Sequence, residues 1–89
     1  MSRAVEKKLV WTAHARIRLQ VRHLDPKWIT ETVFDPDWVE AEPQDRSVDR
    51  SFRAIPEFGG RILRVACVET DSTIRVISVM FDRNARPKP

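Results

Sequence analysis

The hydrophobic pattern of this chain changes its period at Asp35-Pro36-Asp37, and this change constrains the fold more than any other feature. Before this point, apolar residues recur at intervals of three and four residues, which is the spacing of one helix face. After it, apolar and polar residues alternate with the period of a β-strand. Helical segments followed by a run of strands predict an α+β domain, in which the helices pack on one face of a small twisted antiparallel sheet.

Two helices are expected in the first part of the chain. Thr12 is a favourable N-cap for the first helix, and Asp25-Pro26 ends that helix and begins the second one. The second helix, roughly residues 26–34, is expected to bury Ile29 and Val33. The apolar face expected for the first helix consists of Ala13, Ile17, Val21 and Leu24.

About four antiparallel strands are expected in the second part. The alternating pattern places them at residues 38–42, 50–55, 62–69 and 73–81. Residues 43–49 are expected to form a polar loop and residues 56–60 a turn. Residues 8–11 read as a short strand or a lead-in, so a leading edge strand remains an open alternative.

The last two strands form a hairpin whose faces follow from a two-residue turn at Asp71-Ser72. The face toward the helices is expected to carry Leu63, Val65, Cys67, Val76, Ser78 and Met80. The opposite face is expected to carry Ile62, Arg64, Ala66, Val68, Arg75, Ile77, Val79 and Phe81. Because this second face is too apolar to meet water, a cover is expected. The candidates are the tail, another subunit, a partner protein, or strand twist together with the Phe52/Phe58 segment.

The length of 89 residues predicts a single domain over residues 1–89, with a core at about 9–83 and a flexible tail at 84–89. No apolar run is long enough to span a membrane, and the N-terminus lacks the apolar core of a signal peptide, so a cytoplasmic protein is expected. The single cysteine, Cys67, excludes an intramolecular disulfide and a Cys-rich zinc site. With two histidines in addition, we expect no metal and no cofactor.

Charge is segregated along the chain. The net charge is only +3, but it is unevenly distributed. Residues 1–24 carry six basic residues and one acidic residue, and residues 25–45 carry one basic and seven acidic residues. Residues 46–89 carry nine basic and five acidic residues. Twelve of the sixteen cations are Arg, which suits bidentate contacts with phosphate, although genomic codon bias explains this ratio equally well. The small net charge makes a plain nucleic-acid binder the weaker hypothesis.

The residues that could carry chemistry are histidines and arginines. Cleavage of a phosphodiester needs cations that stabilise the charge on the phosphate and a group that transfers protons. Arg64 is the most informative cation, because a charge among apolar strand residues is costly unless it is paired or functional. His14 could transfer protons, since an imidazole ordinarily titrates near neutral pH.

Each of these residues also has a structural interpretation. His14 lies in the first turn of a helix, where a local hydrogen bond or packing is the commoner role. For Arg64, a salt bridge to Glu40 or Glu42 competes evenly with phosphate binding. The three tryptophans could stack on bases but are more often packing residues in a small domain; they are Trp11, Trp28 and Trp38.

Four motifs resemble a bacterial family known as domain of unknown function 4258. The stretch 11–18 resembles its H-A-x-x-R helix opening, and 35–40 its D/N-P-D-x-V-x turn and strand. Residues 59–65 resemble its G-G-R-x-L-R-V strand start, and 75–83 its closing strand. The motifs occur in the expected order and cover most of the chain.

That family is similar in layout to the RelE, ParE and BrnT toxins of bacterial toxin–antitoxin pairs. The resemblance implies a RelE/ParE-like fold and a metal-independent endoribonuclease that acts on mRNA, often on the ribosome. The chain contains no tyrosine, so it lacks the C-terminal Tyr that serves some RelE-type enzymes. His23 stands where many family members have Gly.

The resemblance also implies roles for individual residues. Arg64 and Arg83 would hold the scissile phosphate, and His14 would transfer the proton, so these three are the candidate catalytic residues. The candidate substrate-binding residues are Arg18 of the helix motif, Arg61 of the G-G-R motif, and Arg53, which is named because it interrupts an apolar strand. The 2′-hydroxyl of the RNA would be the nucleophile.

Two functions therefore stay open. One is an endoribonuclease whose partners are RNA or the ribosome and a cognate antitoxin protein. The other is a non-catalytic module with the same fold that binds a partner protein through the apolar sheet face. No membrane partner is expected, and the sequence leaves monomer and homodimer open.

Overall fold

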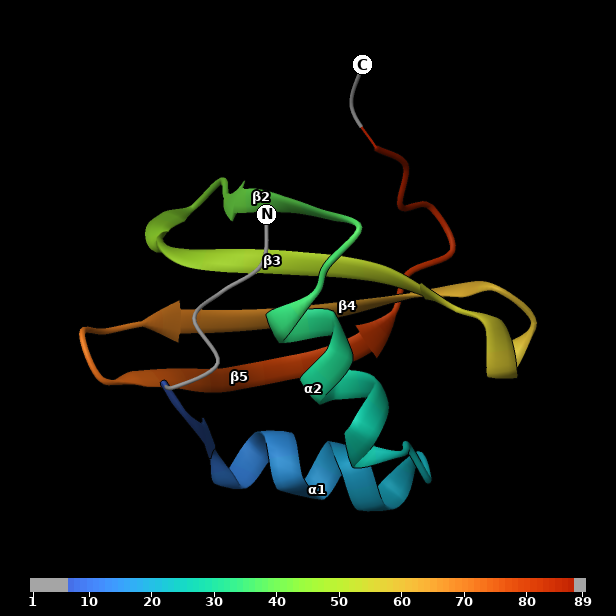
Figure 1. Ribbon diagram of the computed structural model, residues 1–89, viewed down its shortest axis with the longest axis horizontal. Coiled ribbons are helices and arrows are strands. Elements are labelled where there is room, and N and C mark those ends of the chain that lie inside the picture. Colours follow the sequence, from blue (N-terminus) through green and yellow to red (C-terminus); the bar gives the residue numbers. More distant parts are fainter. Residues whose placement is uncertain (1–6, 88–89) are drawn as a thin grey trace.

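A five-stranded sheet covered on one face by two helices forms the protein, of which the computed structural model describes residues 7–87 (Figure 1). In chain order the elements are β1 (Lys8–Trp11), α1 (Ala13–Val21), α2 (Pro26–Phe34), β2 (Trp38–Glu42), β3 (Asp45–Ile55), the 3-10 turn η1 (Pro56–Phe58), β4 (Arg61–Glu69) and β5 (Thr73–Phe81). The strand order is β1-β5-β4-β3-β2. The α+β class and the two N-terminal helices are as predicted. The sheet, however, has one more strand than expected, and the pair β1–β5 is parallel.

The additional strand is β1, the short N-terminal segment that the sequence left open as a strand or a lead-in. It lies at the free edge of β5, where Leu9 is opposite Ile74 and Trp11 is opposite Val76. Leu9 and Trp11 both pack against the core. These apolar contacts explain why so short a segment joins the sheet.

Helix α1 presents a different face to the sheet from the one that we predicted. Ala15 is completely buried, whereas Ile17 is 58% exposed and Val21 is 70% exposed. The Thr12 Oγ1 atom accepts a hydrogen bond from the Ala15 amide, and Thr12 is held to β5 because its own amide donates to the Val76 carbonyl. This anchor fixes the rotation of the helix, and the small side chain of Ala15 lets it lie close to the sheet. The predicted face was therefore wrong for Ala13, Ile17 and Val21 and right for Leu24, which is buried.

The end of α1 forms a Schellman motif without a glycine. The His23 amide donates to the Gln20 carbonyl at 3.3 Å, and the Leu24 amide donates to the Leu19 carbonyl at 3.0 Å. His23 itself has a φ of 53°, in the left-handed region that disfavours residues with a Cβ. The turn into α2 is therefore strained at His23.

Helix α2 agrees with the prediction. The Asp25 carboxylate caps it by accepting a hydrogen bond from the Lys27 amide at 2.9 Å, and Pro26 occupies its first position. Ile29 and Val33 are completely buried. They lie in the same core cluster as the inward-facing residues of β4 and β5.

Strand β3 begins five residues earlier than predicted, at Asp45, so most of the expected polar loop 43–49 is strand. The register places Glu42 of β2 opposite Asp45, which leaves Pro43 and Gln44 as the connection. The residues from Asp45 to Ser47 are exposed. A strand segment that faces water on both sides needs no apolar alternation, and the pattern could not reveal it.

A β-bulge changes which residues of β5 enter the core. Cys67 is opposite Val76, but Ala66 is opposite Ser78, so Ile77 is an extra residue in β5. The predicted assignment of β5 residues to the two sheet faces is correct as far as Val76. After the bulge, each residue lies on the face opposite to the predicted one. Val79 is consequently buried, while Ser78 and Met80 lie on the opposite face. Phe81 packs against the core on the helix side, contrary to the prediction.

The sheet face away from the helices is covered by its own side chains. Trp38 stacks on Phe52 at 4.7 Å between ring centroids, and Phe52 is only 2% exposed. Within residues 7–87, the large apolar side chains that remain exposed are elsewhere: Ile17, Val21, Val39 and Phe58. Among the described residues, the Phe52 part of the expected cover lies on this face, whereas Phe58 lies on the helix side.

The expected tail, residues 84–89, is described as far as Pro87, and residues 88–89 lie outside the described part. After β5 the chain turns, because the Asn84 amide donates to the Asp82 carboxylate at 3.0 Å. No helix in the described part of the chain is long and apolar enough to cross a membrane.

Candidate functional site

Arg53, a predicted substrate-binding residue, lies on the helix side of the sheet and holds the end of α2. Its Nη1 atom donates to the Asp35 carbonyl oxygen at 2.6 Å and to the Asp35 carboxylate at 3.3 Å. Its Nη2 atom lies 3.7 Å from the Glu31 carboxylate. A cation at a helix C-terminus satisfies free carbonyl groups and favours the helix dipole. These contacts account for the charge of Arg53 without a ligand.

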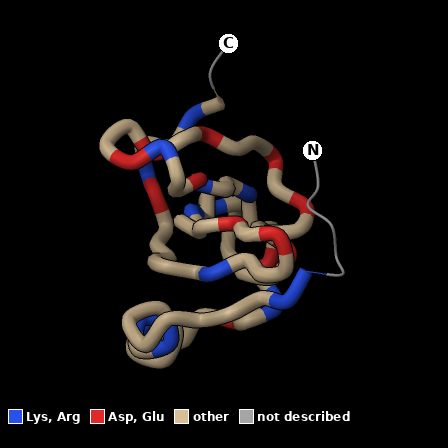
Figure 2. The backbone as a smooth tube through the Cα atoms, turned by 90° about the vertical axis from the view of Figure 1, so that its left-hand side faces the viewer, with Lys and Arg blue, Asp and Glu red and all other residues tan. Residues whose placement is uncertain are grey.

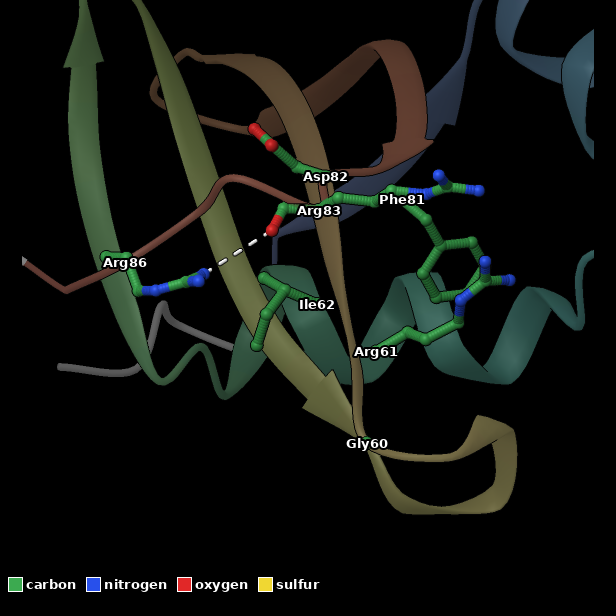
Figure 3. A pocket seen from close by; sticks show the side chains of 7 residues that line it. All are labelled: Gly60, Arg61, Ile62, Phe81, Asp82, Arg83 and Arg86. Atoms are coloured by element: carbon green, nitrogen blue, oxygen red, sulfur yellow. Dashed lines mark hydrogen bonds between the residues drawn. The ribbon is translucent and has the colours of Figure 1, made fainter.

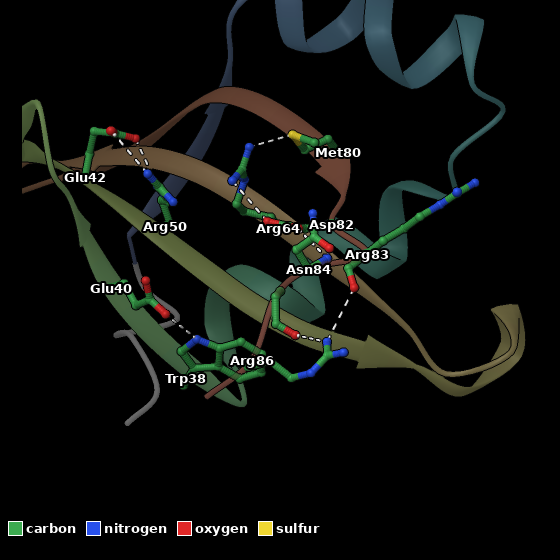
Figure 4. A network of polar contacts seen from close by, with 11 residues as sticks. Trp38, Glu40, Glu42, Arg50, Arg64, Met80, Asp82, Arg83, Asn84 and Arg86 are labelled. Carbon is green, nitrogen blue, oxygen red and sulfur yellow. Dashed lines mark hydrogen bonds and ion pairs between the residues drawn. The ribbon is translucent and has the colours of Figure 1, made fainter. Parts of the chain in front are cut away.

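Arg64, a predicted catalytic residue, lies on the opposite face of the sheet. Its neighbours Leu63 and Val65 are buried against the helices, so alternation turns Arg64 away from them. Its Nη1 atom donates to the Asp82 carboxylate at 3.1 Å, and its Nη2 atom donates to the Met80 sulfur (Figure 4). The carboxylate that pairs with Arg64 comes from the residue after β5 rather than from β2.

A second ion pair lies on the same face between β3 and β2. Arg50 donates to Glu42 through Nε at 2.9 Å and through Nη2 at 3.3 Å, a bidentate contact (Figure 4). The hydrogen bond from Arg50 lowers the pKa of Glu42 below its ordinary value, and the same bond raises the pKa of Arg50. Sequence reasoning did not single out this pair, although opposite charges on neighbouring strands are a usable signal.

His14 and Arg18 are not brought to Arg64. Both lie on α1, which packs on the helix side, so the sheet separates them from Arg64. Thr12 anchors the start of α1 beside Val76. Phe81 lies five residues farther along β5, which corresponds to about 17 Å at 3.3–3.4 Å per residue. His14 is exposed, and the predicted catalytic set of His14, Arg64 and Arg83 is therefore spread over the molecule.

Two of the predicted residues do meet, in a pocket of about 300 Å³ where β4 begins and β5 ends (Figure 3). We call it the arginine pocket. It is lined by Gly60, Arg61, Ile62, Phe81, Asp82, Arg83 and Arg86. The three arginine side chains are exposed, and none of them forms an ion pair with a carboxylate in residues 7–87.

The turn before β4 positions Arg61. Gly59 and Gly60 have φ angles of 68° and 73°, a left-handed conformation that glycine adopts without strain. The Gly60 amide donates to the Ile55 carbonyl at 2.9 Å, which closes the turn and starts β4 at Arg61. The Arg61 guanidinium lies 5.1 Å from the Phe58 ring centroid and 5.8 Å from that of Phe81. Cation–π attraction therefore holds it beside the pocket.

The chain after β5 positions the other two arginines. The Asp82 amide donates to the Ile62 carbonyl at 2.9 Å, which continues the pairing with β4. Beyond the turn at Asn84, the Arg86 guanidinium donates to the Ala85 carbonyl at 2.9 Å and to the Arg83 carbonyl at 3.4 Å. In Figure 3 the Arg61 and Arg83 side chains extend to the same side, and Arg86 approaches from the other side.

The arginine pocket has the composition of an anion-binding site. Guanidinium groups donate in a planar fork that matches phosphate and carboxylate oxygens. The one carboxylate among its lining residues, that of Asp82, accepts hydrogen bonds from Arg64 and from the Asn84 amide. The pocket therefore supplies positive charge, and its lining residues add no histidine or other free proton acceptor.

Arg86 was missed by sequence reasoning because residues 84–89 were interpreted as a tail. The signal that could have found it is Asp82-Arg83-Asn84, since Asp and Asn are typical residues of a tight turn. A second pocket, of about 290 Å³, lies beside α1 and includes a single arginine, Arg16.

No group of three or more His, Cys, Asp or Glu side chains within residues 7–87 could hold a metal ion. Comparison with protein families gives one result: the profile of a family described as a domain of unknown function (DUF4258) matches residues 11–81. No curated protein and no solved structure matches the chain.

Proposed function

We propose that this chain, which belongs to the family described as domain of unknown function 4258, is an RNA-binding protein whose arginine pocket holds phosphate groups. The observation that carries the proposal is the meeting of Arg61, Arg83 and Arg86 at one pocket without a carboxylate partner in residues 7–87. They line the pocket from two sides, so an anion bound there would be attracted by the positive charge of each of them.

The choice of RNA over other polyanions comes from the resemblance to RelE-, ParE- and BrnT-type toxins. The neighbourhood of the pocket supports it, because Phe81 lines the pocket and Phe58 lies beside Arg61. Proteins that bind single-stranded nucleic acid combine positive charge with aromatic side chains.

Endoribonuclease activity is a narrower hypothesis that needs a proton acceptor at the scissile phosphate. In the described residues His14 lies on the helix side at the start of α1, which is anchored beside Val76, five residues of β5 before the pocket residue Phe81. Asp82 is engaged by Arg64. The geometry thus supports phosphate binding better than cleavage. We propose binding as the function and make cleavage a readout of its test.

The test measures binding of a fluorescent single-stranded RNA by anisotropy at low salt, with the length of the RNA checked afterwards. We expect Arg83→Gln to weaken binding by about 10-fold, since each contact to a charged group contributes on the order of 1.5–3 kcal/mol. Arg75→Gln is the matched control, because Arg75 is an exposed arginine of β5 outside the pocket. Equal losses in both variants, or no binding by the wild-type chain, would contradict the proposal. If the wild-type chain shortens the RNA and Arg83→Gln does not, the protein also cleaves RNA.

A second candidate function, binding of a partner protein, is favoured by the exposed side of α1. Ile17 and Val21 form an apolar stripe there, and His14, Arg16 and Arg18 flank it. The helix contains no acidic residue, and Figure 2 shows its cations at one end of the molecule and the carboxylates of the β2–β3 hairpin at the other. The stripe therefore suits an acidic segment with apolar side chains, as an antitoxin could provide. The proposed binding surface is thus on α1, whereas the sequence led us to expect the apolar sheet face.

This second candidate is tested with the protein encoded by the adjacent reading frame. We expect Ile17→Lys to weaken that complex at least 10-fold, because a charge in an apolar contact is costly. Val39→Lys is the control, since Val39 is exposed to a similar degree on β2. An unchanged affinity of Ile17→Lys would exclude α1 as the binding surface.

A further inference from the structure

Phe58 is a partly solvent-exposed aromatic residue beside the arginine pocket. It is 40% exposed, whereas its aromatic neighbours Trp28 and Phe81 are partly buried against the core. Exposing a phenylalanine in water is unfavourable. The part of the ring that remains exposed lies beside Arg61 of the arginine pocket.

The ring of Phe58 is held in place from two sides. Its centroid lies 4.9 Å from that of Phe81 and 5.7 Å from that of Trp28. The closed turn with Gly59 and Gly60 fixes its backbone. A rigid aromatic side chain loses little conformational entropy when it binds a ligand.

Arg61 belongs both to this aromatic group and to the arginine pocket. Its guanidinium lies 5.1 Å from the Phe58 ring centroid, and the same side chain lines the pocket with Arg83. Bases of single-stranded RNA stack on aromatic rings and on guanidinium planes. The base of one nucleotide and the phosphate of its neighbour could therefore be held at the same time.

We propose that Phe58 and Arg61 form a stacking site for an unpaired nucleobase. The inference rests on the proposed function, because the phosphates beside that base are held by the arginine pocket. Within a duplex the faces of the bases are covered by their neighbours, so the stacking site selects single-stranded RNA. Bases of every kind have a π-face, and the selection is for an unpaired base rather than for one sequence.

The experiment compares two single-stranded oligomers with the same number of phosphates, one with bases and one without. We expect the wild-type chain to bind the oligomer with bases about 10-fold more tightly. Phe58→Leu should abolish this difference while it binds the oligomer without bases as the wild type does. Phe58→Tyr keeps the ring and should preserve the difference. Circular dichroism and the Tm of each variant establish that it is folded.

The outcomes separate the two proposals. Arg83→Gln could weaken binding of both oligomers while Phe58→Leu still prefers the oligomer with bases as strongly as the wild type does. In that case the proposed stacking site is wrong, and the proposal of phosphate binding stands. If the wild-type chain binds neither oligomer, both proposals are wrong. If a Phe58→Leu variant that has lost stability still prefers bases, Phe58 is a packing residue only.

Discussion

Two groups of arginines in this molecule differ in what surrounds them. Arg50, Arg53 and Arg64 lie within the sheet, and each is paired with a carboxylate. Arg61, Arg83 and Arg86 line the pocket at the start of β4 and the end of β5, where no described carboxylate pairs with them. The number of arginines therefore says little about where an anion can bind, because the position of the acidic residues determines which arginines are paired.

The acidic segment 25–45 explains much of this division. It contributes Glu31 and Asp35 to Arg53, and Glu42 to Arg50, so its carboxylates pair with two arginines of β3. Arg64 is paired by Asp82 from the last third. The net charge of +3 therefore conceals three paired arginines of the sheet and, within residues 7–87, three pocket arginines without a carboxylate partner.

The largest effect is expected from removing the pocket cations together. The triple variant Arg61→Gln, Arg83→Gln and Arg86→Gln should bind single-stranded RNA about 100-fold more weakly, because its phosphate contacts are lost. The control triple variant replaces Arg16 and Arg18 of α1 and its C-cap residue Arg22 by Gln and removes the same charge. Anisotropy titrations of both variants measure the effect. Equal losses of affinity would show that the pocket arginines bind RNA no better than those of the α1 segment.

The free energy of unfolding is expected to depend on the paired arginines rather than on the pocket arginines. Arg53→Met should lower the free energy of unfolding by about 1–2 kcal/mol, since it removes the contacts that hold the end of α2. Arg83→Gln should change it by no more than about 0.5 kcal/mol, as an exposed side chain does. Urea unfolding measures both, and a larger loss for Arg83→Gln would contradict the division.

A change away from both groups separates stability from binding. His23→Gly should raise the free energy of unfolding by about 0.5–1 kcal/mol, because glycine adopts the left-handed conformation of this residue without strain. RNA affinity should stay as in the wild type. A variant no more stable than the wild type would show that His23 contributes contacts that offset its strain.

The smallest effect concerns the pH dependence of the Glu42–Arg50 pair. Because the folded pKa of Glu42 is lowered, the pair stabilises the protein above the ordinary value of 4.5. That stabilisation is lost as the pH falls through the lower folded pKa. Wild type should therefore exceed Glu42→Gln in Tm at about pH 6 and lose this advantage at about pH 3. A difference independent of pH would mean that Arg50 does not act through the charge of Glu42.

The features that could be predicted from the sequence are those with a local cause. Thr12 and Asp25-Pro26 mark helix starts through capping groups, and Asp71-Ser72 forms the expected turn, in which the Thr70 amide donates to the Thr73 carbonyl. The rotation of α1 and the inversion after Ile77 depend on contacts between segments distant in sequence. The hydrophobic pattern does not contain these contacts.

The candidate site followed the same rule. Arg61 and Arg83 were named from the sequence. Their shared pocket could not be predicted, because the register of the hairpin determines that the start of β4 lies beside the end of β5. Arg86 was not predicted, because the turn after β5 that brings it to the pocket is seen only in the structure. Arg53 and Arg64 were named for their unusual strand positions, and it is their carboxylate partners that explain those positions.

The salt dependence of RNA binding shows whether the pocket arginines contact phosphate. Each phosphate contact to a single strand contributes a slope of about −0.7 in log K against log salt, so three arginines predict about −2 for the wild type. Arg83→Gln should reduce the steepness by about 0.7, and Arg53→Met should leave the slope unchanged. Identical slopes for the wild type and Arg83→Gln would contradict the account, because the free arginines would then not contact phosphate.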